Sequence, residues 1–355
     1  MPFARVLGAL LALCAAAAME LACAQEPSLD ELIARARKRD AEAEYALALR
    51  AYEGRGIARD PVQALRLAER AAQHGNLEAQ NTYGFFLQHG VGTEPDPARA
   101  RQWYETAANR GHAGAQVNLG SLYEQGLGVE RSRTTALEWY RKAMAQGSPE
   151  AEFNAANVLE TDSPPDAAAA AAGYARAAAK GLAPGNFRLG RLIEQERVPA
   201  SQYGSALERY AAAAAGGVAD AQKLIEDPET IFRLCQRLEP APALPWLRKA
   251  AAKGFAPAQL ALGIALEEGR GTARDPAEAA LWYAKAGEAR NAEALYRLSQ
   301  LYDEGSGVTR DTVRARDLLS QAADLGNRRA QERVDALLGT GLGPLPAGDP
   351  FRGLR

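Results

Sequence analysis

The feature that most limits the fold of this chain is a nine-residue segment that occurs twice. EGRGIARDP at 53–61 returns as EGRGTARDP at 268–276, and only its fifth residue differs. The longer segments that begin at Ala79 and Ala115 start 36 residues apart (115 − 79), and the same spacing returns near the other end of the chain. A fixed period between 20 and 50 residues is typical of a solenoid or a propeller. The sequence therefore predicts a stack of similar units.

Each unit divides in the same way. A first helix, helix A, has apolar residues at helical spacing, such as Leu119 and Leu122. A Gly-x-Gly turn follows, because glycine adopts the positive φ that ends a helix. An Asp-Pro pair, such as Asp96-Pro97, then begins helix B, where the aspartate accepts free backbone N–H groups and the proline fits the first turn. Trp-Tyr pairs recur on helix B at 103–104, 139–140 and 282–283.

The stretch LGSLYEQGLGVERSRTTALEWYRKAMAQGSPEAE at 119–152 resembles the Sel1-like repeat, a relative of the tetratricopeptide repeat. It has the ordered Leu-Gly, Tyr-x-x-Gly-x-Gly, Ala-x-x-Trp-Tyr-x-x-Ala and Gly-x-x-x-Ala pattern. The resemblance implies an all-α, right-handed α-solenoid of about eight helix-turn-helix repeats over residues 43–329. The units start near Ala43, Ala79, Ala115, Ala151, Gly185, Ala221, Ala258 and Ala294.

The middle units, at about 151–257, depart from this pattern. The Gly-x-Gly turn is replaced by Asp162–Pro165 in the fourth unit, by Glu196–Val198 in the fifth and by a stretch that ends at Pro242 in the sixth. Neutral drift in loops accounts for these changes. A change in curvature, with a hinge or exposed loop around Glu226–Pro245, accounts for them equally well.

The two ends of the array have the features of caps. A capping-box pattern that starts at Ser28 predicts an N-terminal capping helix within 25–42. Residues 330–338 are predicted to form a C-terminal capping helix, because the last repeat needs a polar outer face. The tail 339–355 is rich in glycine and proline and is predicted to be disordered. Phe351 and Leu354 leave open a docking peptide there.

Residues 1–24 are predicted to be a signal peptide. Arg5 precedes an apolar run that is too short to span a bilayer, and small residues precede a cleavage site after Ala24. The mature chain would then be periplasmic or secreted and would have no transmembrane helix. The alternative is a lipoprotein acylated at Cys23, although Glu20 stands where such signals have an apolar residue. After cleavage only Cys235 remains, and we expect it to be buried and apolar.

No motif predicts catalysis, a cofactor or a metal site. The three histidines, His74, His89 and His112, have no carboxylate or cysteine at recurring ligand spacing. The glycine turns lack the lysine and hydroxyl residues of phosphate loops. The net charge of −2 predicts no nucleic-acid partner. The Trp-Tyr pairs have a fixed place on helix B, which favours packing over carbohydrate stacking. Cysteine-rich relatives linked to β-lactam hydrolysis carry a disulfide in each helix pair, which one cysteine cannot form.

The candidate site is a row of residues on helix A that is left after the packing positions are removed. Positions 3, 6 and 10 of each unit share one face of helix A. The resemblance implies that helix A lines the concave side, so that this row would face the groove. The row consists of Thr82, Phe85, His89, Asn118, Ser121, Gln125, Asn154, Asn157, Arg188, Arg191 and Gln195. A merely solvated face is the alternative.

The function that these observations predict is non-catalytic. The chain would be an exported scaffold that binds a partner protein or peptide on its concave helix-A surface and organises a cell-envelope complex, as the resemblance implies. The alternative is a glycan-handling accessory protein in exopolysaccharide export or peptidoglycan remodelling.

Overall fold

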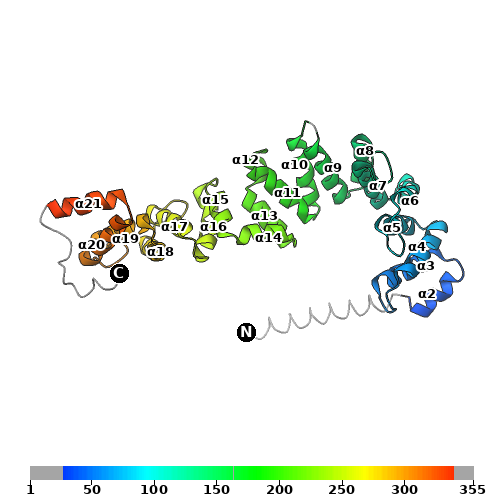
Figure 1. Cartoon of the computed structure of the whole chain (residues 1–355), viewed down its shortest axis with the longest axis horizontal. Helices are drawn as coiled ribbons and strands as arrows, with labels where there is room; N and C mark the ends of the chain where they lie inside the picture. Colours follow the sequence, from blue (N-terminus) through cyan, green and yellow to red (C-terminus); the bar gives the residue numbers. More distant parts are fainter. Residues whose placement is uncertain (1–26, 163, 340–355) are drawn as a thin grey trace, which may run out of the picture. The chain divides into compact units, whose positions relative to one another are not determined.

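The structure is a computed structural model that describes residues 27–162 and 164–339. These residues form helices joined by turns, without a strand, and Figure 1 shows the helices in chain order. The prediction of an all-α chain of helix-turn-helix repeats is confirmed. None of the described helices combines the length and the apolar character that a membrane span requires.

The helices alternate as predicted between an A and a B position. Helix A of successive repeats is α3 (Ala41–Glu53), α5 (Leu77–His89), α7 (Ala113–Gln125), α9 (Pro149–Thr161), α11 (Ala183–Glu194), α14 (Ala219–Glu226), α17 (Ala256–Glu268) and α19 (Ala292–Glu304). Helix B is α4 (Pro61–Gln73), α6 (Pro97–Asn109), α8 (Arg133–Ala145), α10 (Ala167–Ala179), α13 (Ala206–Ala215), α16 (Pro240–Ala252), α18 (Pro276–Glu288) and α20 (Thr312–Asp324). Each predicted unit start lies two residues into an observed helix A.

Four further helices lie outside this alternation: α2 (Leu29–Ala36), α12 (Ala200–Tyr203), α15 (Pro228–Cys235) and α21 (Arg328–Gly339). The Ser28 side chain caps α2 by accepting from the Glu31 N–H, and α2 lies within the predicted segment 25–42. The last helix, α21, includes the predicted segment 330–338 and also the first residue of the predicted tail. The predicted signal peptide 1–24 and the tail beyond Gly339 lie outside the described residues.

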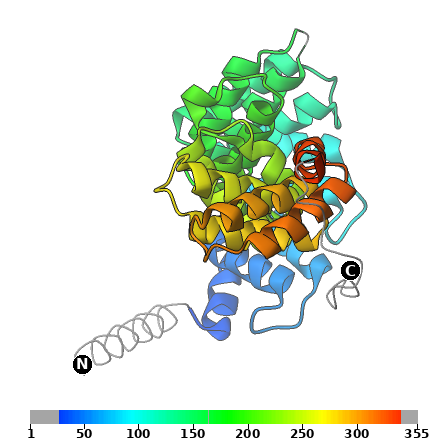
Figure 2. The same cartoon turned by 90° about the vertical axis from the view of Figure 1, so that its left-hand side faces the viewer.

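The chain divides into two compact units, Met1–Gly173 and Tyr174–Arg355, with the division inside α10. In unit 1, from α3 to α9, each helix A packs against helix B of its own repeat, and that helix B packs against helix A of the next repeat. In unit 2, α17 to α20 follow the same order and lie side by side in Figure 2, in yellow and orange.

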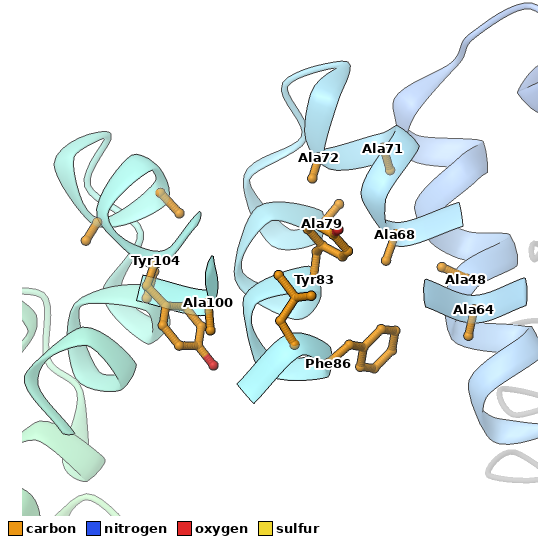
Figure 3. Close-up of a cluster of buried hydrophobic side chains, with 14 of the residues drawn as sticks. Ala48, Ala64, Ala68, Ala71, Ala72, Ala79, Tyr83, Phe86, Ala100 and Tyr104 are labelled. Carbon is orange, nitrogen blue, oxygen red and sulfur yellow. The ribbon is translucent and has the colours of Figure 1, made fainter. Parts of the chain in front are cut away.

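The core of unit 1 combines alanines with a few large aromatic side chains. Figure 3 shows Ala64, Ala68 and Ala71 of α4 facing a group that includes Tyr83 and Phe86 of α5, all of them buried. Small side chains on helix B let neighbouring helices approach closely, and the aromatic rings fill the remaining volume at the density of a protein interior. The alanines of α4 therefore set the spacing between this helix B and helix A of the next repeat.

The second glycine of the Gly-x-Gly turn makes the contact between repeats. A Cβ atom added to Gly128 would lie 2.5 Å from the backbone nitrogen of Ala98, at the start of helix B of the preceding repeat. In unit 2, Gly271 has the same relation to Ala241, again at 2.5 Å. Gly56 is different, because nothing lies within 4 Å of an added Cβ. The turn thus packs on the main chain of the preceding repeat wherever such a repeat exists.

One of the alternatives for the middle units was an exposed loop around Glu226–Pro245, and the structure has helices in most of this segment. Helix A of the sixth repeat ends at Glu226, and Asp227 then caps a new helix, α15, whose first residue is Pro228. Proline lacks the N–H that a helix interior needs, yet it fits a first turn, so Pro228 begins α15 where α14 has ended. The following helix B, α16, contacts α15 and α17. The stretch is therefore mainly helical.

The residue at a fixed place just after helix B has a positive φ in every repeat. It is a glycine in all repeats except one. Glycines take this conformation in seven described repeats: Gly75, Gly111, Gly147, Gly181, Gly217, Gly254 and Gly326. In the seventh repeat Arg290 takes it, with φ of 60°. The left-handed conformation costs an L-residue about 1–2 kcal/mol, because Cβ approaches the following carbonyl oxygen. The Arg290 backbone is therefore strained where the other repeats have glycine.

We expect Arg290→Gly to raise the free energy of unfolding by about 0.5–1 kcal/mol, since glycine removes the strain but is more flexible in the unfolded chain. Arg290→Ala is the matched control, because alanine retains Cβ and should give no such gain. Urea denaturation followed by circular dichroism measures both variants. Equal midpoints for the glycine and alanine variants would show that the conformation is not strained.

Candidate binding surfaces

A buried tyrosine on helix B links the two helices of a repeat. Its hydroxyl donates to a polar residue 16 positions earlier, near the end of helix A. The pairs are Tyr104 with Gln88 at 2.9 Å, Tyr140 with Glu124 at 2.7 Å, Tyr283 with Glu267 at 2.5 Å, and Tyr210 with Glu194. Burial raises the pKa of each of these tyrosines, and the carboxylate partners raise the pKa of Tyr140, Tyr210 and Tyr283 further. Sequence reasoning missed these pairs, although the 16-residue spacing recurs in the sequence.

The tryptophan rings are engaged by side chains of their own chain. The Lys142 ammonium lies 3.6 Å from the centroid of Trp139, and the Lys285 ammonium lies 4.3 Å from that of Trp282. Trp103 meets the Tyr83 ring at an edge. A sugar ring would have to displace these contacts to stack there. The geometry thus supports packing for the Trp-Tyr pairs.

The first position of the predicted row lies between neighbouring helices. In unit 1, the Thr82 hydroxyl lies 3.2 Å from the Tyr45 hydroxyl of the preceding repeat. Asn118 Nδ2 donates to Asn81 Oδ1 at 2.9 Å. In unit 2, Arg188 Nε donates to the Tyr174 hydroxyl at 3.4 Å. These side chains hold repeats and helices together, which limits what they can offer to a partner.

Two more residues of the row affect a buried tyrosine. The Ser121 and Asn154 side chains oppose the increase of the pKa of Tyr140 that burial and Glu124 cause. Asn157 is half-buried in α9, and its backbone carbonyl accepts from the Thr161 hydroxyl at 2.9 Å. These three residues are thus only partly exposed.

The remaining row residues are the most accessible ones. Phe85 is 37% exposed, and its ring centroid lies 4.4 Å from that of His89, which is also exposed. The exposed Gln125 donates from Nε2 to Ser121 Oγ at 2.7 Å. The structure therefore brings together Phe85 with His89 on α5, and Ser121 with Gln125 on α7. Arg191 and Gln195 are exposed at the end of α11, in unit 2.

The repeat itself matches a known family. The model of the Sel1 repeat matches residues 41–76, 77–112, 113–148, 243–255, 256–291 and 292–327, which together are more than half of the chain. The chain belongs to the Sel1 repeat family. The matches leave out 149–242, where helix A of the sixth repeat is interrupted and α12 is inserted.

Several solved structures are similar to this Sel1 repeat protein. A protective antigen of uropathogenic Escherichia coli with an SLR fold is 28% identical, over 90% of this chain and 68% of its own, with a TM-score of 0.48. A Sel1 repeat protein from Oxalobacter formigenes is 29% identical, over 87% of this chain and 90% of its own, with a TM-score of 0.44. No curated protein matches the chain.

The unmatched part of this Sel1 repeat protein contains a cavity that the sequence did not predict. It has a volume of about 480 Å³ and lies among α11, α12, α13 and α15 of unit 2. Its wall includes four buried apolar side chains: Ile193, Val198, Leu207 and Leu234. At its edge, Arg237 Nη1 donates to the Glu194 carbonyl oxygen at 2.6 Å. The cavity depends on α12 and α15, which have no counterpart in the regular repeats.

Two of the histidines make hydrogen bonds within the fold, and the one described cysteine is buried. His74 Nδ1 lies 2.7 Å from the buried Glu44 carboxylate, and His112 Nδ1 accepts from the Ala115 N–H at the start of α7. Cys235 is buried as expected, and burial raises the pKa of its thiol to about 12. Within 27–162 and 164–339, no three His, Cys, Asp or Glu side chains are grouped so that they could hold a metal ion.

Proposed function

We propose that this Sel1 repeat protein is a non-catalytic scaffold that binds an extended segment of a partner protein through the helix-A row of unit 1. The observation that carries the proposal is the exposed Phe85, because its neighbour Phe86 is 1% exposed while Phe85 remains 37% exposed. A large apolar side chain held at the surface beside polar groups is a typical anchor at an interface.

The chemistry of the row favours a polar peptide with one apolar side chain. Phe85 and His89 supply adjacent rings on α5, and Ser121 and Gln125 supply hydrogen-bonding groups at the corresponding positions of α7. Equivalent positions on successive helices form a regular series of contacts, which suits an extended segment. Export to the cell envelope, with cleavage after Ala24, is part of the proposal.

Phe85→Ala is expected to weaken binding of the partner by about tenfold or more, since truncation of an interface anchor typically costs over 1 kcal/mol. The melting temperature should change little, because the ring is already partly exposed. Leu281→Ala is the matched control, since Leu281 is 65% exposed but lies on a helix B. Its substitution should leave binding unchanged.

The partner is identified by replacing Phe85 with a photo-crosslinking amino acid in cells, with the same replacement at Leu281 as the control. We expect one partner protein to be captured from position 85 and not from position 281. The Sel1 repeat protein in the crosslinked product should begin at Gln25. Equal capture at both positions would contradict the proposal. A captured glycan would instead support the accessory role in polysaccharide or peptidoglycan handling.

A further inference from the structure

A buried glutamine recurs near the start of helix A, and its amide group donates in the same way each time. Gln80, Gln116 and Gln259 are 4%, 4% and 6% exposed. In each, Nε2 donates at 3.1 Å to the carbonyl of an alanine near the end of the preceding helix B: Ala72, Ala108 and Ala251. The donor end of this side chain is therefore satisfied in all three repeats.

The acceptor end is satisfied in only two of them. Gln80 Oε1 accepts from Arg110 Nη1 at 3.3 Å, and the same nitrogen donates to the Gly75 carbonyl at 3.0 Å. Gln116 Oε1 accepts from Gln146 Nε2 at 2.8 Å. Both donors come from the residue 30 positions after the glutamine, just past the next helix B. This position supplies the donor that the buried carbonyl oxygen needs.

In the seventh repeat the donor is missing. The residue 30 positions after Gln259 is Ala289, and Gln259 Oε1 is buried without a hydrogen-bond partner in the described part of the chain. The eighth repeat has no buried acceptor to satisfy, because Leu295 stands at the position of Gln259 and Leu325 at the position of Ala289. The seventh repeat thus combines a buried acceptor with a side chain too short to reach it.

A cavity of about 490 Å³ lies at this point, entirely within unit 2, and we call it the Gln259 pocket. It is lined by Ala251, Ala252, Gly254, Gln259, Lys285, Glu288 and Ala289. Gly254 corresponds to Gly75, so the pocket contains the counterparts of both residues that Arg110 contacts in the second repeat. The pocket lies where the Arg110 side chain lies in that repeat.

The surroundings of the pocket favour a cation that carries several donors. Glu288 adds a carboxylate to the lining, and both α16 and α18 end beside the pocket, where the helix dipole is negative. Lys285 lines the pocket too, but its ammonium lies over the Trp282 ring. Arg290 follows at an exposed position and is not part of the lining. A guanidinium presents several N–H donors in one plane, as Arg110 does to two acceptors.

We propose that the Gln259 pocket binds the guanidinium group of an arginine side chain from a partner, in the position that Arg110 occupies in the second repeat. Gln259 Oε1 accepts one N–H, the Gly254 carbonyl accepts from the same group, and Glu288 balances the charge. The proposal deepens the scaffold function and rests on it for the source of the arginine. The pocket itself is testable with a small molecule.

The test uses the mature chain and N-acetyl-arginine amide, with N-acetyl-citrulline amide as its neutral isostere. Binding is followed by the NMR shift of the Gln259 side-chain amide. For one side chain we expect a dissociation constant on the order of 1 mM. The citrulline compound should bind at least tenfold more weakly. Equal binding of the two compounds, or no movement of the Gln259 signal, overturns the proposal and indicates water as the only occupant.

Ala289→Arg supplies the guanidinium from within the chain, as Arg110 does, and should abolish binding of the arginine compound. The double variant Gln259→Leu with Ala289→Leu copies the eighth repeat and should abolish it by removing the acceptor. Binding that persists in either folded variant overturns the proposal. Because the probe is a free compound, failure to find a partner at Phe85 leaves this result unaffected, and the two proposals fail separately.

Discussion

Gly271→Ala is expected to lower the free energy of unfolding by about 2–4 kcal/mol, whereas Gly56→Ala should cost about 1 kcal/mol. The two glycines lie in nearly identical nine-residue segments and have φ of 73° and 71°. Alanine is therefore strained equally at both. At Gly271 the new Cβ would also lie 2.5 Å from the backbone of Ala241, while at Gly56 it would meet nothing within 4 Å. The difference measures the contact between repeats.

Urea denaturation of both variants, followed by circular dichroism, tests this expectation. Gly128→Ala serves as a second example, because its Cβ would meet the backbone of Ala98 at the same distance of 2.5 Å. We expect it to resemble Gly271→Ala. Equal losses at Gly56 and Gly271 would mean that only backbone conformation matters, and that repeats do not rest on each other through these turns.

Tyr140→Ala is expected to cost about 3–5 kcal/mol, because it leaves a cavity where a fully buried ring packed. The ring lies on Gly120, whose added Cβ would come within 2.6 Å of it. Tyr140→Phe keeps the ring and removes only the hydroxyl bond to Glu124, so we expect a loss of about 1.5–3 kcal/mol, as for bonds to charged groups.

Tyr104→Phe is the matched control, because the partner of Tyr104 is the neutral Gln88. Its loss should be nearer 1 kcal/mol. The pH dependence gives a second measurement. The raised pKa of Tyr140 means that the unfolded chain ionises first, so its contribution is complete below about pH 10 and is lost as the pH rises further. Stability of Tyr140→Phe should fall less steeply above pH 10. A parallel fall would contradict the assignment.

Much of the fold follows from residues with a single physical role. The glycine turns and the Asp-Pro pairs mark helix ends because their backbone requirements are local, and the predicted unit starts agree with the helices throughout. Pro228 shows the limit of such reasoning. It lies in the segment for which an exposed loop was one alternative, but with Asp227 before it this proline begins α15. Whether a proline ends or begins a helix depends on the residue that caps it.

The candidate site was less predictable, because periodicity within one helix does not reveal what the neighbouring helix contributes. Thr82 and Asn118 share a face with Phe85, yet both bind side chains of the preceding repeat. The Gln259 pocket could not be predicted from the sequence for the same reason. It arises from the pairing of two positions 30 residues apart, and its signal is the short Ala289 where Arg110 and Gln146 stand elsewhere.

The packing of the glycine turn on the preceding helix B has a consequence for how such chains vary. The atoms that exclude a Cβ at Gly128 and Gly271 are backbone atoms, so this contact does not depend on the side chains of the preceding helix B. At this contact the side chains of the preceding helix B can vary without affecting the glycine turn. Exchange of one repeat for another is therefore limited by the side-chain bonds between repeats, such as Asn118 with Asn81, and not by the turn.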